Sequence, residues 1–396
     1  MPGNRRSFLS ATLAAGLLLT SAACAQDRTD GSTQASTLRI GLLASLSGTY
    51  QSVGMDMRNG FELYLKTHDD KLGGHPIDLR VADEGEGAPT ALPSATKLIK
   101  DDNVIALTGI VSGGSVAAVA PLLDEAKIPL IGANGRPELK DVSRVWHTSF
   151  LADEPGIAIA QYIKDKVNGP VYAIGPDHRD GGDELRGFTD SYAKVGGQVV
   201  NPGGKAVLTP FPRTTDFTPY LSQIKASGAK AVYAFYTGDS AVDFVRQYAQ
   251  SDVRDIPLYA AGFLTEGSVL GAQGDAARDI YSVLNYSPDL DNEENHEFVA
   301  AWKQAFPDLA PTTYAMASYD AAAVLDRAIA AAGEEPTSDS INDAIANLGQ
   351  IPSPRGPWQF GKKNHSPVQK WYLRQVRNDG RALSNVVIQD LATVGN

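Results

Sequence analysis

The sequence predicts an α/β protein built from two doubly wound parallel-sheet lobes. Its 396 residues exceed the roughly 100–200 residues of a single domain, so two domains are expected. Short apolar runs alternate with helical patterns along most of the chain, a βαβ spacing typical of a parallel sheet that helices cover on both faces. After Pro288 the pattern is helical without alternating strands, so we expect these helices to return to the first lobe.

The first series of elements begins at Leu38, where the leading polar segment gives way to an apolar run. Buried-strand patterns predict strands at 38–43, 77–81, 104–107 and 128–131, and helical periodicity predicts helices at 55–68, 90–100 and 115–126. Gly73 and Gly74 follow the first helix and predict its end. These elements form the sheet and the covering helices of the first lobe.

The second series follows a break at 148–155. It predicts helices at 156–167, 183–194, 217–226 and 240–250, and strands at 171–174, 198–200, 231–236, 258–261 and 280–284. Helices at 293–306, 312–332 and 338–348 and a late strand at 369–376 complete the chain. We expect lobe 1 to comprise 38–150 with 285–366, and lobe 2 to comprise 151–284 with 367–396. Crossings near 148–155, 282–288 and Ser366 then form a multi-crossover hinge beside a ligand-trapping cleft.

Composition excludes several function classes. The 35 Lys+Arg against 46 Asp+Glu leave a net charge of −11, which disfavours nucleic-acid binding. Cys24 is the single cysteine, so no intrachain disulfide or thiolate metal cluster can form. The six histidines form no H-x-x-x-H pair, and no Walker or G-x-G-x-x-G sequence occurs. We therefore expect no metal, no cofactor and no enzymatic activity. We also expect a monomer.

The N-terminus has the features of an export signal. Arg5 and Arg6 precede a short apolar stretch, and residues 21–24 read SAAC. The paired arginines resemble a twin-arginine signal, and the SAAC end resembles a lipobox, in which Cys24 receives diacylglycerol and becomes the new N-terminus. We assign 1–24 to an export signal with lipobox and 25–37 to a flexible tether. The alternative is a secreted protein cleaved near Ala23.

Collinear motifs cover almost the whole mature chain. Residues 40–48 read IGLLASLSG, 73–77 read GGHPI, 107–113 read LTGIVSG, 126–131 read AKIPLI and 318–321 read SYDA. In this order and spacing they resemble the leucine/isoleucine/valine-binding protein family, the solute-binding components of ABC importers. The resemblance implies a type I periplasmic-binding-protein fold, a small-molecule solute, an ABC permease partner in the membrane and an extracytoplasmic location.

The first-lobe loops offer candidate ligand contacts at the carboxyl ends of strands, where doubly wound sheets bind ligands. Residues 112–115 follow a strand and open a helix, so their N–H groups and hydroxyls can hold a carboxylate with help from the helix dipole. The resemblance implies that Ser112 contacts the ligand carboxylate, whereas an N-cap with a tight turn is the structural alternative. The candidates in these loops are Ser112, Gly113, Gly114, Ser115, Ala133, Asn134 and Gly135.

The second-lobe loops depart from the family pattern. Gly262 stands where the family has the acid that pairs with a ligand ammonium, Gly181 where it has a tyrosine, and Gly135 where it has a threonine. A desolvated ammonium without a counter-charge costs several kcal/mol, so α-amino-acid binding is disfavoured unless Glu266 or Asp180 substitutes. The remaining candidates are Asp180, Tyr236, Thr237, Gly262, Phe263 and Tyr314, with His178 and Arg136 beside them.

The sequence leaves three functions open. We favour a lipid-anchored binding protein of an ABC importer, whose ligand is a small amino acid, an amide or an aromatic carboxylate. Among these ligands we favour a carboxylate or neutral amide whose other end is apolar or aromatic over leucine or valine. A sensory protein of the same fold that reports to a receptor is the first alternative. An exported hydrolase is the weaker one, because the cleft loops carry no nucleophile and base pair.

Replacing Cys24 tests the anchor. We expect Cys24→Ala to move the protein from the membrane fraction to the soluble fraction, because two acyl chains hold a protein stably at a bilayer and the variant cannot receive them. Fractionation of cells after export, followed by immunoblotting, measures the distribution. Membrane association equal to that of the unaltered protein would refute the anchor.

Overall fold

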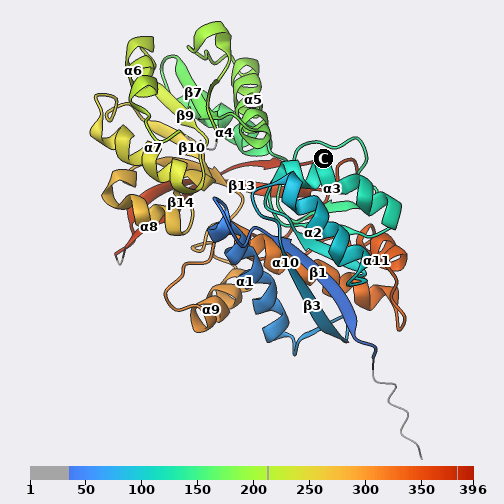
Figure 1. Ribbon diagram of the computed structural model, residues 1–396. Coiled ribbons are helices and arrows are strands. Elements are labelled where there is room, and N and C mark those ends of the chain that lie inside the picture. Colours follow the sequence, from blue (N-terminus) through green and yellow to red (C-terminus); the bar gives the residue numbers. More distant parts are fainter. Residues whose placement is uncertain (1–34, 212–213, 381) are drawn as a thin grey trace, which may run out of the picture. The chain divides into compact units, whose positions relative to one another are not determined.

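Two sheets organise the chain, as Figure 1 shows. The computed structural model describes residues 35–211, 214–380 and 382–396, and the unit from Ala35 to Asn396 contains both sheets. The export signal with Cys24, and residues 25–34 of the predicted tether, lie outside the described residues. The predicted α/β class with two lobes is confirmed.

The lobe 1 sheet has the order β2-β3-β1-β4-β5-β6. Its strands are β1 Leu38–Ala44, β2 Lys71–Leu72, β3 His75–Asp83, β4 Ala106–Gly109, β5 Leu130–Gly132 and β6 Val145–His147. All neighbours pair in parallel except β2 with β3. Strands β4, β5 and β6 are buried along their whole length, as expected for a parallel sheet covered on both faces.

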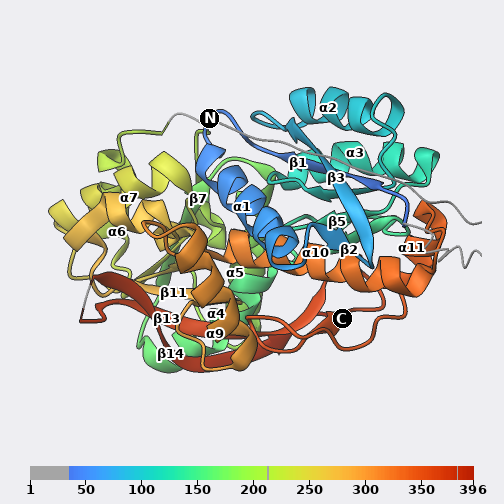
Figure 2. The ribbon, with the colours of Figure 1, turned by 90° about the horizontal axis from the view of Figure 1, so that it is seen from below.

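Helices from both ends of the sequence cover this sheet. They are α1 Gln51–Thr67, α2 Ala88–Lys100, α3 Gly113–Ala126, α9 Glu293–Ala305, α10 Thr313–Ala332 and α11 Ser338–Ile345. Figure 2 shows α10 beside α1. A Cβ on Gly60 would lie 2.1 Å from the carbonyl oxygen of Ala315, so this close approach requires glycine. The predicted return of the late helices to the first sheet is correct.

The lobe 2 sheet has the order β12-β13-β11-β10-β9-β7-β8, with β14 paired to β13. Its strands are β7 Val171–Pro176, β8 Val207–Thr209, β9 Ala231–Ala234, β10 Leu258–Ala261, β11 Tyr281–Leu284, β12 Gln359–Phe360, β13 Pro367–Asn378 and β14 Leu383–Val394. The predicted parallel pairing holds from β8 to β11, and the sheet departs from it at one edge, where β13 runs antiparallel to β11, β12 and β14. The strand predicted at 198–200 is only an isolated bridge from Val171 to Val199, and β8 takes its place.

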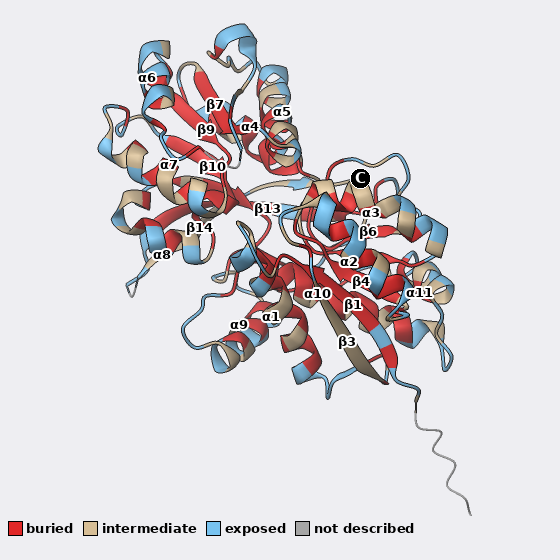
Figure 3. Ribbon diagram, in the orientation of Figure 1, coloured by how far each residue is buried: buried red, intermediate tan, exposed pale blue. Residues whose placement is uncertain are grey.

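Helices cover the second sheet as well, and Figure 3 shows buried strands under helices with exposed outer faces. They are α4 Glu154–Lys166, α5 Arg179–Lys194, α6 Thr218–Ser227, α7 Gly238–Gln250 and α8 Ser268–Gln273, with 3₁₀ turns η1 Pro202–Gly204, η2 Gly262–Thr265 and η3 Gly274–Ala277. Helix α5 begins four residues before its predicted start. His178 caps it, since its Nδ1 accepts a 3.2 Å hydrogen bond from the Gly181 N–H.

The chain passes between the sheets after β6, after β11 and before β12. The side chain of Gln369, in β13, links the segments that follow β6 and β11. Its Nε2 donates to the Ser149 carbonyl at 2.5 Å, and its Oε1 accepts from Asn285 Nδ2 at 2.9 Å. Gln369 is buried, so these bonds form away from water. The lobe boundaries and the hinge motion stay predictions of the sequence.

A buried ion pair supports the same junction. Arg355 Nη2 lies 2.6 Å from Asp320 Oδ2, and both side chains are 1% exposed. Arg355 also donates to Gln369 Oε1 at 2.6 Å and to the Thr148 carbonyl. Burial raises the pKa of Asp320 despite the attraction of Arg355, so desolvation is the larger effect on this carboxyl. Removing either partner would leave an uncompensated buried charge.

Asp320→Ala tests the junction. We expect a loss of about 3–5 kcal/mol in the free energy of unfolding, because the Arg355 guanidinium would remain buried without its partner. Urea unfolding measures this loss. Asp390→Ala is the matched control, since its pair with Lys370 is 3.1 Å long and more than half exposed, and should cost about 0–1 kcal/mol. Equal losses in the two variants would contradict the role of the buried pair.

Candidate functional site

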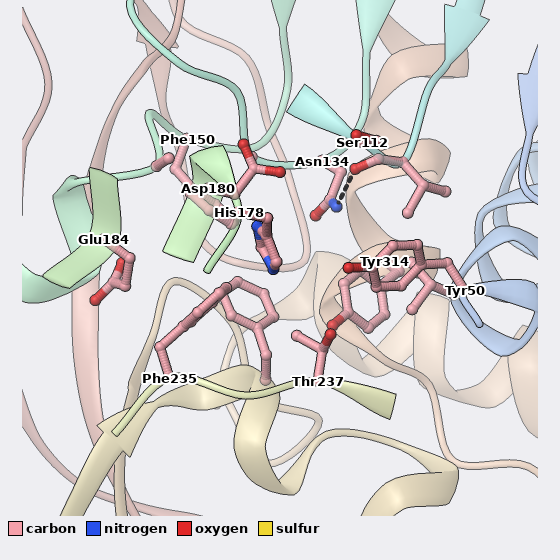
Figure 4. Close-up of a pocket in the computed structure, with 15 residues that line it drawn as sticks. Tyr50, Ser112, Asn134, Phe150, His178, Asp180, Glu184, Phe235, Thr237 and Tyr314 are labelled. Atoms are coloured by element: carbon pink, nitrogen blue, oxygen red, sulfur yellow. Dashed lines mark hydrogen bonds between the residues drawn. The ribbon is translucent and has the colours of Figure 1, made fainter. Parts of the chain in front are cut away.

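A pocket lies where the carboxyl ends of strands from both sheets face each other, and Figure 4 shows its labelled residues. It holds about 560 Å³ of empty space, open solvent at its mouth included. Its lining comes from loops and helix starts of both lobes. The lining residues are Tyr50, Val53, Val111, Ser112, Asn134, Gly135, Phe150, Ala152, His178, Asp180, Glu184, Phe235, Thr237, Phe263 and Tyr314.

Aromatic rings form much of the wall. The ring centroid of Phe263 lies 5.4 Å from that of Phe150, 5.8 Å from that of Phe235 and 5.9 Å from that of Tyr314. These separations are those of favourable aromatic pairs. The wall therefore offers flat apolar surfaces contributed by the segment after β6, by the segments after β9 and β10 of the second sheet, and by α10.

The loop before α3 is held by a buried carboxylate of the protein itself. Glu84 accepts hydrogen bonds from the N–H groups of Val111 at 2.6 Å and Ser112 at 2.9 Å. Burial raises the pKa of Glu84, and these two bonds oppose the rise. The Ser112 N–H is therefore already used. Ser112 occupies the N-cap position of α3, but its hydroxyl accepts no capping hydrogen bond from the helix.

Asp180 connects the two lobes across the pocket. Its Oδ2 accepts a 3.3 Å hydrogen bond from the Gly113 N–H at the start of α3. Its Oδ1 is buried and has no hydrogen-bond partner among the described residues. Burial raises the pKa of this carboxyl to about 6. The N–H predicted to meet a ligand carboxylate thus meets a side-chain carboxylate of lobe 2.

His178 and Glu184 add two polar groups that stay uncharged near neutral pH. The Nδ1 of His178 accepts from Gly181, which assigns the proton of the neutral ring to Nε2, and burial lowers the His178 pKa to about 4. Tyr233 donates its hydroxyl proton to Glu184 Oε1, and burial raises the Glu184 pKa to about 8. Both groups can therefore donate hydrogen bonds without carrying charge.

Two further contacts shape the end of the pocket near Ser112. Asn134 Nδ2 donates to the Val111 carbonyl at 2.7 Å, which fixes the amide beside Ser112. The hydroxyl of Tyr50 is hydrogen-bonded to Thr237, and the Tyr50 ring stacks with Phe211 at 6.3 Å. Tyr50 belongs to lobe 1 and the other two residues to lobe 2, so these contacts also span the cleft.

The structure brings together seven of the sequence-predicted ligand residues. Those that line the pocket are Ser112, Asn134, Gly135, Asp180, Thr237, Phe263 and Tyr314, and those that do not are Gly113, Gly114, Ser115, Ala133, Tyr236 and Gly262. Tyr236 is 1% exposed and turns into the lobe 2 core, where its hydroxyl lies 3.3 Å from Thr209 Oγ1. Ser115 and Ala133 are fully buried. Ligand contact itself stays a prediction for all of them.

Two buried arginines, Arg374 and Arg136, account for how the loops around the missing acid and around Gly135 differ from the sequence expectation. A Cβ on Gly262 would lie 2.7 Å from Arg374 Nη2, so a basic group occupies the space beside the position of the missing acid. Glu266 does not replace that acid, because its Oε2 pairs with Arg374 at 3.0 Å and its Oε1 accepts from the Thr313 N–H at 2.9 Å. Arg136 is fully buried and donates to the carbonyls of Pro137 and Asn364, away from the pocket.

Sequence reasoning missed several lining residues. Tyr50, Phe150, Glu184 and Phe235 line the pocket but were not among the candidates. One signal was available for Glu184, which follows Asp180 by four positions and so shares its face of α5. Phe150 has no comparable signal, because it lies in an irregular crossing segment.

The described residues contain neither a metal-binding group of side chains nor a membrane-spanning helix. Among residues 35–211, 214–380 and 382–396, no group of three or more His, Cys, Asp or Glu side chains is placed to hold a metal ion. Within the same part of the chain, no helix is both long enough and apolar enough to cross a bilayer.

Comparisons with known proteins agree with this architecture. The family model for periplasmic binding protein matches residues 37–381. A solute-binding protein of an ABC transporter from R. palustris, solved with benzoate, is 31% identical, with 91% of this chain and 98% of that chain covered and a TM-score of 0.82. A second one from R. palustris, solved with 4-hydroxybenzoate, is 27% identical over 90% and 97%, with a TM-score of 0.83.

A curated relative agrees as well. The Leu/Ile/Val-binding protein homolog 6 of Brucella melitensis is 26% identical over 370 residues, which are 91% of this chain and 93% of that protein. The family model covers far more than half of the chain, and the matched residues include every strand of both sheets except β14. The chain therefore belongs to the periplasmic binding protein family, as a relative of the Leu/Ile/Val-binding proteins.

Proposed function

We propose that this protein is the extracytoplasmic, lipid-anchored solute-binding component of an ABC importer and that its solute is an aromatic carboxylate. The observation that carries the proposal is the aromatic wall around Phe263. A flat ring buries its faces well against such walls. The R. palustris proteins solved with benzoate and 4-hydroxybenzoate support the same ligand class.

The carboxylate of the solute binds at the Ser112 end of the pocket. The Ser112 hydroxyl is available there, because only its N–H is bonded to Glu84. Tyr314, which also carries a hydroxyl, lines the same pocket. Hydroxyl donors can bind a carboxylate by charge-assisted hydrogen bonds without a cationic side chain.

An α-amino acid is a poorer solute for this pocket. Its ammonium needs a carboxylate counter-charge once it is out of water. Glu266 is already paired with Arg374, and Gly262 has no side chain.

Asp180 and Glu184 are the acids among the described lining residues. Asp180 Oδ2 is bonded to Gly113, and a solute ammonium there would lie beside the helix N-terminus that repels it. Glu184 lies at the end of the pocket opposite Ser112, whereas the ammonium of an α-amino acid is attached beside its carboxylate.

Calorimetry on the purified protein tests the solute class. We expect micromolar or tighter binding of benzoate and much weaker binding of leucine. Ser112→Ala should weaken benzoate binding by about tenfold, the effect of losing a hydrogen bond to a charged group. Ser222→Ala on the exposed side of α6 is the matched control and should leave the Kd unchanged. Micromolar binding of leucine or valine with no response to benzoate would overturn the proposal.

Asp180 makes the affinity depend on pH. Its pKa is raised to about 6, so its carboxyl is neutral below that pH and can donate from Oδ1 to a solute anion. Above about pH 6 the ionised carboxylate repels the anion, so the benzoate Kd should rise between about pH 5 and about pH 7. Nearby Asp183 and Glu84 raise the Asp180 pKa further, and Arg179 lowers it.

The variant Asp180→Asn should remove most of this dependence, because an amide donates over the whole range. His178 stays neutral there, with a pKa of about 4, and Glu184 titrates higher, at about 8. Calorimetry in two buffers of different ionisation enthalpy measures the proton uptake that accompanies binding. A pH profile of Asp180→Asn that is as steep as that of the unaltered protein would exclude Asp180 as the titrating group.

A further inference from the structure

Glu184 lines the pocket and has a buried carboxyl oxygen without a hydrogen-bond partner among the described residues. The side chain is 1% exposed, and its Oε2 makes no hydrogen bond to any described residue. Figure 4 shows Glu184 at the end of the pocket opposite Ser112, beyond Phe150 and Phe235. A buried polar atom without a hydrogen bond lowers the stability of the fold, and a ligand group that bonds to it removes this penalty.

Its neighbours hold the carboxyl in a fixed orientation. Tyr233 is fully buried and donates its hydroxyl to Glu184 Oε1. The Tyr233 ring stacks on Phe188 with centroids 3.9 Å apart, so the tyrosine cannot turn away without disturbing the core. The backbone N–H of Gly156 faces the same carboxyl, and the charge of Asp153 acts on it. Tyr233 occupies Oε1, so Oε2 is the carboxyl oxygen that a ligand group can meet.

We propose that Glu184 is a specificity-determining residue that binds a ring hydroxyl of the solute, so that the preferred solute is a 4-hydroxybenzoate-type acid. This inference rests on the proposed function, because it takes the solute carboxylate to be at the Ser112 end. The ring then lies against Phe263, and the substituent opposite the carboxylate points to Glu184. A hydroxyl at that position meets Oε2.

A hydroxyl suits this position better than other substituents. A phenol both donates and accepts, so it pairs with a carboxyl in either protonation state. A second carboxylate would meet an acid in a site without a cation among the described lining residues. A methyl group or a bare ring leaves Oε2 unpaired, and sites with buried polar groups reject analogues that lack the matching group.

Calorimetry with three ligands tests the inference. The protein should bind 4-hydroxybenzoate at least about tenfold more tightly than benzoate. The isomer 2-hydroxybenzoate is the ligand control, because its hydroxyl lies beside the carboxylate and it should bind no more tightly than benzoate. In Glu184→Leu the benzoate-to-4-hydroxybenzoate Kd ratio should fall to about one, and in Glu184→Gln, whose amide still donates, it should stay above about three.

Asp190→Leu, on the exposed side of the same helix, is the variant control and should keep the ratio of the unaltered protein. If Glu184→Leu does not fold, as judged by thermal unfolding, Glu184→Ala gives the same readout. Equal Kd values for benzoate and 4-hydroxybenzoate, or an unchanged ratio in the Glu184 variants, would overturn this inference alone. Binding of neither acid at millimolar concentration would instead overturn the proposed function.

Discussion

The buried ion pair between Asp320 and Arg355 holds together the segments that join the two sheets. Arg355 reaches the Thr148 carbonyl and Gln369, and Gln369 reaches the Ser149 carbonyl. The next residue along the chain is Phe150, whose ring packs on Trp371 at 5.6 Å and on Phe263 at 5.4 Å. The hydrogen bonds of the junction thus fix the backbone that carries one aromatic wall of the pocket. The stability of this junction and the position of that wall of the pocket therefore depend on the same pair.

A second constraint comes from the protein's own carboxylates at the start of α3. Glu84 takes the N–H groups of Val111 and Ser112, and Asp180 takes that of Gly113. A loop that follows a strand and opens a helix commonly binds anions through its backbone N–H groups. Here the side-chain carboxylates of Glu84 and Asp180 accept hydrogen bonds from the first of these N–H groups. Glu84 belongs to lobe 1 and keeps the loop in place, whereas Asp180 belongs to lobe 2 and spans the cleft. The Ser112 hydroxyl remains as the side-chain donor.

The sequence predicted the repeating strand and helix order because that order depends on local periodicity. It did not predict β14, whose residues are mostly half-buried and show no clean alternation, nor the antiparallel edge that β13 forms. The sequence located some pocket loops correctly but named a neighbouring residue beside the one that lines the pocket. Thr237 lines the pocket while Tyr236 turns into the core, because consecutive residues of an extended segment point to opposite sides. Phe150 and Glu184 depend on tertiary packing, which periodicity does not report.

The electrostatics of the pocket follow from burial rather than from its formal charge. Asp180 and Glu184 are both acids, yet burial raises their pKa values to about 6 and about 8, so the two groups lose their protons at different pH. At neutral pH the carboxyl near Ser112 is the one that ionises, while the one beside Tyr233 stays neutral. The anionic solute that we propose would be opposed at one end by a charge that protonation removes and would meet a neutral donor at its far end. Formal charge alone would disfavour such a solute, but burial keeps Glu184 protonated near neutral pH and Asp180 protonated below about pH 6.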